Sequence, residues 1–227
     1  MHDWRLLLRG DDSQLALLAP TPLGGGFEIE KTEEGYVLRG TALDGLPSLQ
    51  DAERSAQEFL KRLGAAFLVA RHEALSISTA GKARAVDSSG KERRYQTFLS
   101  PTTFTLRVIS GDELALDAFV APWMRLSDTD ASVQRVFALI ASGPQSWNSL
   151  FAIKEVVEAD VHDLIANYVP RAALKRFDRT ANHPYAAGLG ARHAVSHADP
   201  PRPPMPLPEA TDLILKMVRC WVQGKTT

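Results

Sequence analysis

The feature that most constrains the fold is a change in hydrophobic pattern near residues 127–130, which read Ser-Asp-Thr-Asp. Before this point short apolar runs are separated by glycine and polar turns, and after it the apolar residues recur at helical spacing. A chain of 227 residues can form one large domain or two ordinary ones. We therefore expect an α+β protein, with a mainly β N-terminal module over residues 1–127 and an all-α bundle over residues 128–227.

The N-terminal module is expected to contain strands and a single helix. Residues 27–31 alternate, turn and return over 36–39, which predicts a hairpin. Ser48 and Asp51 have the spacing of a capping box, so the helix is expected over residues 48–63, with Gly64 ending it. Further apolar runs indicate strands; they lie at 4–9, 15–18, 66–70, 75–78, 94–98 and 104–108.

In the C-terminal part the apolar spacing predicts a series of helices. They are expected over about 131–142, from Pro144 to about 157, over 160–168, over 171–177, and from Pro208 to the end. The proline-rich residues 200–208 are expected to be a stiff connector.

Composition narrows the class of protein. The net charge of −1 does not by itself indicate a nucleic-acid partner. The single cysteine, Cys220, cannot form an internal disulfide and suits a reducing compartment; beside Trp221 it is expected to be a small core residue.

The longest apolar run, residues 65–70, is too short to span a bilayer, and the acidic N-terminus is a poor signal peptide. We expect a cytoplasmic protein without a membrane segment. The glycine run at 24–26 lacks the lysine of a phosphate-binding loop, and no cofactor is expected.

The segment that carries chemistry holds Arg192, His193 and His197 between a glycine pair and consecutive prolines. Because a residue before proline is driven out of helical geometry, a short helix is expected to end near Asp199. An arginine can hold the negative charge of a phosphodiester, and a histidine can move protons near neutral pH. The helix end and Asp199 both favour the imidazolium, so the pKa of His197 is expected to rise.

Arg192, His193 and, four residues later, His197 resemble the Arg-x4–6-His motif of the HEPN superfamily, over roughly residues 131–222. The resemblance implies a helical bundle with metal-independent ribonuclease activity, in which the RNA 2′-hydroxyl is the nucleophile. It implies that Arg192 and His197 are catalytic and that His193 supports them. It also implies a homodimer through the helical domain and an antitoxin or antiviral-defence partner. The N-terminal module would act as a sensor, substrate selector or assembly surface.

A basic stripe near the motif favours RNA as a partner. Its cations recur at helical spacing and are followed by two polar residues, so the predicted RNA-binding set is Arg171, Lys175, Arg176, Arg179, Asn182 and His183. The alternative is a solvated surface paired with Glu155, Glu158 and Asp160.

Other interpretations of the motif remain open. Arg192 and His197 can cap the helix and pair with Asp199. His193 and His197, four residues apart, can share a metal with a third ligand from His183, Asp199 or His162, but no His-Glu-x-x-His pattern is present and no metal is expected. A non-catalytic, dimerising protein that binds RNA or nucleotides is the alternative function.

Overall fold

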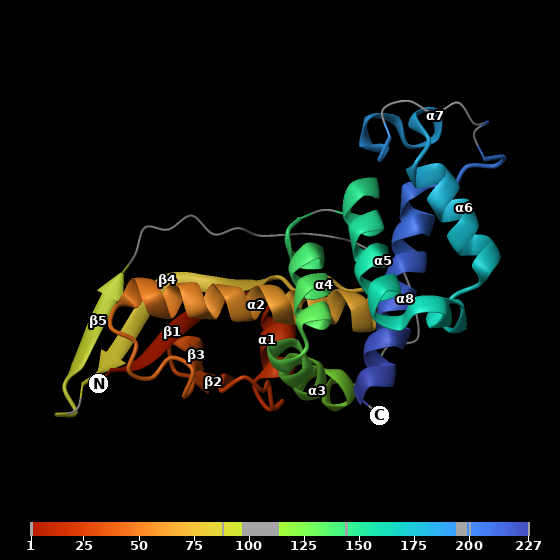
Figure 1. Cartoon of the computed structure of the whole chain (residues 1–227). Helices are drawn as coiled ribbons and strands as arrows, with labels where there is room; N and C mark the ends of the chain where they lie inside the picture. Colours follow the sequence, from red (N-terminus) through yellow and green to blue (C-terminus); the bar gives the residue numbers. More distant parts are fainter. Residues whose placement is uncertain are drawn as a thin grey trace. The chain divides into compact units, whose positions relative to one another are not determined.

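The computed structural model describes residues 2–87, 89–96, 114–143, 145–193, 199 and 201–226 (Figure 1). The chain forms two compact units, Met1–Thr129 and Asp130–Thr227. The first unit contains a five-stranded antiparallel sheet with helices, and the described part of the second consists of helices and loops. The predicted α+β fold class is confirmed.

The sheet of the first unit has the strand order β2-β3-β1-β4-β5. Its strands are β1 (Asp3–Gly10), β2 (Glu28–Thr32), β3 (Gly35–Arg39), β4 (Ile77–Val86) and β5 (Glu92–Gln96), and every neighbouring pair is antiparallel. The predicted hairpin is confirmed as β2 and β3. The strand expected at 104–108 lies outside the described residues.

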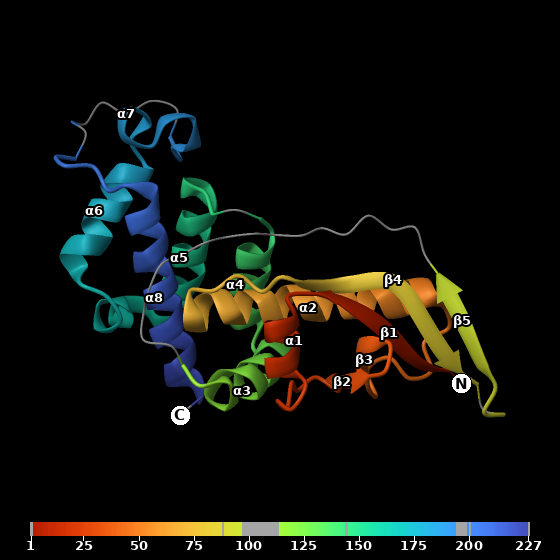
Figure 2. The same ribbon diagram turned by 180° about the vertical axis from the view of Figure 1, so that it is seen from behind.

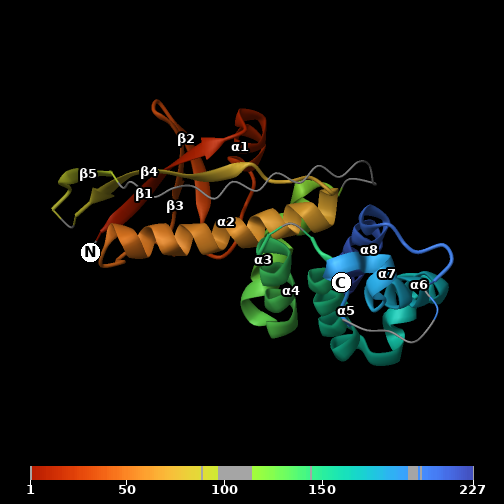
Figure 3. The ribbon, with the colours of Figure 1, turned by 90° about the horizontal axis from the view of Figure 1, so that it is seen from above.

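One face of this sheet is buried beneath the long helix α2 (Leu49–Arg71), as Figure 3 shows. Along β1 the side chains of Trp4, Leu6 and Leu8 are buried, whereas the intervening residues are partly exposed. Leu8 lies opposite Thr79, whose hydroxyl donates to Glu53 of α2 at 2.6 Å. The even-numbered residues of β1 therefore face the helix, and the odd-numbered ones occupy the opposite face.

The start of α2 agrees with the prediction from sequence, and its end does not. The Ser48 side chain accepts a hydrogen bond from the Asp51 amide at 3.2 Å, which confirms the predicted cap. The helix does not stop at Gly64 but continues to Arg71, and the supposed strand at 66–70 is helical and buried. A glycine inside a helix costs only about 1 kcal/mol, which is less than the gain from burying the apolar turn that follows it.

Two further helices correct the expectation of a single helix. The run at 15–18 belongs to α1 (Asp12–Leu18), because the Asp11 carboxylate accepts from the amides of Ser13 and Gln14 and caps a helix start. The helix α3 (Leu116–Thr129) closes the unit, and its Phe119 packs edge-on against Phe67 of α2.

The second unit is a helical bundle built around α5, which contacts α4, α6 and α8 (Figure 2). Its helical elements are α4 (Ala131–Ala141), α5 (Trp147–Val161), η1 (His162–Asn167), α6 (Arg171–Ala181), α7 (Pro184–Ala187), η2 (Gly188–Gly190) and α8 (Leu207–Thr226). The helix expected at 160–168 is the short 3₁₀ helix η1, and α5 begins with a capping box between Ser146 and Ser149. Pro144, expected to begin this helix, lies outside the described residues.

Cys220 is a free, partly buried cysteine. In the described ranges, no helix combines the length and apolar character needed to cross a membrane.

An ionic bridge joins the first residue of this unit to its last helix. The Lys225 ammonium lies 2.8 Å from carboxylate oxygens of both Asp130 and Asp160, and Trp221 Nε1 donates to Asp160 at 2.9 Å. Burial raises the pKa of each carboxyl, but the hydrogen bonds from Lys225 and the other donors outweigh it, so the pKa values of Asp130 and Asp160 lie below the ordinary range. The bridge therefore favours the folded state at neutral pH.

We predict that Lys225→Met lowers the free energy of unfolding by about 1–2 kcal/mol at neutral pH, because two charged hydrogen bonds are lost. Carboxyl groups with a lowered folded pKa stabilise above the unfolded pKa of about 4, and this contribution is lost as the pH falls through the folded value. Urea denaturation should therefore show a difference between variant and wild type that shrinks progressively as the pH falls below about 4. Lys216→Met, on an exposed position of the same helix, is the control. A difference independent of pH would contradict the assignment.

Candidate functional site

Arg192 lies in the loop after η2 and not in a helix. Its backbone amide donates to the carbonyl of Ala181 at 2.9 Å, which fastens the loop to the end of α6. Ala191 is extended, and His193 has no regular structure either. The expected helix is therefore wrong for Arg192 and His193, because the loop amide is taken by α6 instead of starting a new turn. His197 lies outside the described residues.

The Arg192 side chain is held by two residues one helical turn apart on α5. Its Nη2 lies 3.0 Å from Glu155 Oε1, and its guanidinium carbon lies 4.3 Å from the centre of the Phe151 ring. Stacking on an aromatic face and a carboxylate contact both restrict the guanidinium. The side chain still exposes 44% of its surface, and His193 beside it is exposed. An ordered cation and an accessible imidazole thus stand together at the surface.

A buried charge network lies on the same face of α5. The Lys154 side chain is 7% exposed, and its Nζ is 2.9 Å from Glu158 and 3.2 Å from Asp178 of α6. Burial lowers the pKa of Lys154, but these carboxylates outweigh it and the pKa is raised. Burial raises the pKa of Asp178, and Lys154 offsets part of this rise. The charge of Arg192 also acts on Asp178, so the network is electrostatically coupled to the loop.

The basic stripe is divided between two roles. Arg171, Lys175 and Arg179 are exposed along α6. Arg176 donates to the carbonyls of Pro203 and Pro204 at 3.1 and 2.9 Å and pairs with Glu209 at 2.6 Å. It therefore fastens the proline-rich connector and the start of α8 to α6.

Three carboxylates could have neutralised the basic stripe, but each forms its ion pair with a different cation. Glu155 contacts Arg192, Glu158 contacts Lys154 and Asp160 contacts Lys225.

Asn182 and His183 are held in the fold. His183 is buried, and its Nδ1 accepts from the Tyr185 amide at 3.3 Å, which caps α7. Asn182 ends α6, and its buried Oδ1 has no hydrogen-bond partner among the described residues. Within the same ranges no three histidine, cysteine or acidic side chains gather as a metal would require. The capping role makes His183 a structural residue here.

Phe151, Lys154 and Asp178 are residues of the candidate site that the sequence did not reveal, and Glu155 was expected only as a partner of the basic stripe. The signal available was the spacing of 151, 154, 155 and 158, which places four side chains on one face of α5. That spacing does not reveal that the loop at Arg192 returns to this face.

No family model, curated protein or solved structure matches the chain. The resemblance to the HEPN motif therefore stays a prediction from sequence.

We predict that Glu155→Gln loosens the loop without unfolding the bundle. An exposed ion pair contributes about 0.2–1 kcal/mol, so the melting temperature should change little, whereas hydrogen–deuterium exchange should accelerate in peptides covering 188–193. Arg171→Ala, an exposed change on α6, is the control. Unchanged exchange in Glu155→Gln would show that Glu155 does not order the loop.

Proposed function

We propose that the helical unit is a cytoplasmic, metal-independent endoribonuclease of HEPN type. The supporting observation is Arg192, which Glu155, Phe151 and the Ala181 carbonyl position while its guanidinium stays partly exposed beside His193. A guanidinium ordered before binding loses little conformational freedom when it contacts a phosphate. That is what stabilisation of a charged transition state requires.

In the proposed reaction the RNA 2′-oxygen attacks the adjacent phosphorus and loses its proton to a base. The bond from phosphorus to the 5′-oxygen breaks, and that oxygen takes a proton from an acid. The products are a 2′,3′-cyclic phosphate and a 5′-hydroxyl. His197 moves the proton, His193 supports it, and Arg192 holds the charge on the non-bridging oxygens.

The proposal includes a homodimer, because the chain carries the motif once. Tyr185 and Leu189, just before Arg192, are 88% and 108% exposed. Large apolar side chains exposed together indicate a contact surface. A dimer through this segment would bring two motif loops together, and an antitoxin or defence-system partner would control the site.

We predict that the protein is a dimer in light scattering and that Leu189→Glu shifts it toward monomer, because a buried charge opposes association. Leu164→Glu, at another exposed leucine of the helical unit, is the control. A monomeric wild type at high concentration would rule out this assembly.

The second candidate is a non-catalytic RNA-binding protein. The observation that favours it is the ion pair to Glu155, which neutralises the cation that a phosphate would need. In that case Arg192 serves mainly to fix the loop.

We predict that wild type cleaves labelled RNA in excess chelator, leaves DNA intact and produces 2′,3′-cyclic phosphate ends. His197→Ala should lose about 10²–10⁴ in rate. Arg192→Ala should lose about 10²–10³. Arg171→Ala should weaken binding and leave the rate at saturating RNA unchanged.

Each other outcome of this assay decides against the proposal. Cleavage by all variants at one rate would indicate a contaminant, and loss of cleavage in chelator would indicate a metal enzyme. No cleavage by any of them, with RNA still bound, would establish the non-catalytic alternative.

A further inference from the structure

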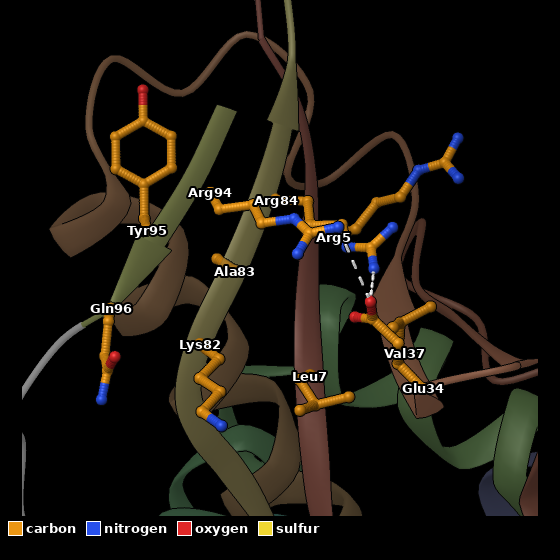
Figure 4. A pocket seen from close by; sticks show the side chains of 10 residues that line it. All are labelled: Arg5, Leu7, Glu34, Val37, Lys82, Ala83, Arg84, Arg94, Tyr95 and Gln96. Atoms are coloured by element: carbon orange, nitrogen blue, oxygen red, sulfur yellow. Dashed lines mark ion pairs between the residues drawn. The ribbon is translucent and has the colours of Figure 1, made fainter. Parts of the chain in front are cut away.

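The open face of the sheet in the N-terminal unit carries a hollow of about 620 Å³ (Figure 4). It lies on the side of β1 that holds Arg5 and Leu7, opposite the side covered by α2. Among the described residues that line it, one is a carboxylate, Glu34, and four are cations: Arg5, Lys82, Arg84 and Arg94. Leu7 and Val37 form an apolar floor.

The strand register places three of these cations in one row. Arg5 lies opposite Arg84, and Arg84 lies opposite Arg94, so adjacent strands β1, β4 and β5 each contribute a guanidinium. Like charges directly opposite one another destabilise a sheet. A second row, with Lys82 opposite Gln96, lies two residues away, which is about 7 Å along a strand. The hollow therefore presents successive places for negative charge.

Glu34 shows what the row can bind. Its Oε1 pairs with Arg84 and lies 3.8 Å from Arg94, so two guanidinium groups converge on one oxygen, as the dashed lines in Figure 4 mark. Glu34 lies in the turn between β2 and β3, and its side chain is about half exposed. Glu92 contacts both arginines from the flank, and Asp3 contacts Arg5. The position of Glu34 Oε1, where the Arg84 and Arg94 guanidinium groups converge, could therefore be occupied by an oxygen of another anion.

We propose that this arginine face, defined as Arg5, Lys82, Arg84 and Arg94, binds the phosphodiester backbone of single-stranded RNA. In the free protein the Glu34 carboxylate occupies the position that one phosphate takes in the complex. Guanidinium forks match phosphate oxygens in two-point contacts, and two rows of donors suit a polymer with repeated charges.

The recognition is independent of base sequence. Tyr95 lines the hollow, but its ring packs 5.2 Å from the ring of Trp4, on the buried side of the sheet. It does not offer its face for stacking with a base, and the contacts that remain reach the backbone only. The proposal stands independently of the cleavage proposed for the helical unit.

The test measures binding of a fluorescent 2′-O-methyl RNA, which has no free 2′-hydroxyl and cannot be cleaved by that route, to the full chain. The double variant Lys82→Ala/Arg94→Ala should lose about tenfold or more in affinity and show a shallower salt dependence, since two phosphate contacts are removed. Both side chains are exposed, Arg94 by 75%, so the fold should persist.

The matched control is Lys91→Ala/Arg93→Ala, which removes the same charge. Arg93 lies on β5 opposite Ala85, a residue of the buried face, and so points away from the row. This control variant should lose less than about threefold in RNA affinity, because only the long-range electrostatic field changes. Glu34→Gln should bind more tightly than wild type by about threefold or more, since the competing carboxylate is neutralised.

Three results would overturn the proposal. The first is an equal loss in both double variants, which would reduce the effect to net charge. The second is weaker or unchanged binding by Glu34→Gln. The third is competition by polyglutamate as effective as unlabelled RNA of equal charge, which would assign the face to an acidic peptide.

Discussion

The geometry of the helical unit depends on the burial of a charged lysine. Lys154 is 7% exposed and keeps its charge only because carboxylates from α5 and α6 meet its ammonium. Loss of the Lys154 cation would leave the carboxylates that meet it without their buried partner, and breaking a buried ion pair in this way costs several kcal/mol. Asp178 therefore fixes α6 against α5, and the carbonyl of Ala181 at the end of α6 fixes the Arg192 loop in turn. The exposed Arg192 loop is therefore held in place by the buried ion pair between Lys154 and Asp178.

The starts of α2 and α4 were predictable from sequence, and the end of α2 was not. Ser48 and Asp130 cap helices through hydrogen bonds to amides two or three residues away, and such contacts are visible in sequence. The end of α2 depends on burial of the turn beyond Gly64, which is decided by the rest of the unit. The run at 15–18 was misassigned for a different reason: its apolar pattern is too short to separate helix from strand, and the Asp11 cap makes it a helix.

The candidate site was predictable in its cation but not in its surroundings. The spacing of Arg192 and His193 singled out the segment, and both side chains are exposed. Helical periodicity places Phe151 and Glu155 on one face of α5, yet it carries no information on which distant loop returns to that face. The expected helix failed for the same reason, since the Arg192 amide bonds to the end of α6 across the intervening α7 and η2.

Both proposed anion sites already hold an anion of the protein itself. Glu155 occupies one edge of the Arg192 guanidinium, and Glu34 bridges Arg84 and Arg94. A tethered carboxylate keeps each guanidinium ordered, but a ligand must displace it or share its donors, which lowers the affinity for any single phosphate. A polymer gains from linked contacts, because each phosphate bound raises the effective concentration of the next. Under the two proposals, guanidinium groups paired in this way would favour a nucleic-acid strand over free phosphate and mononucleotides.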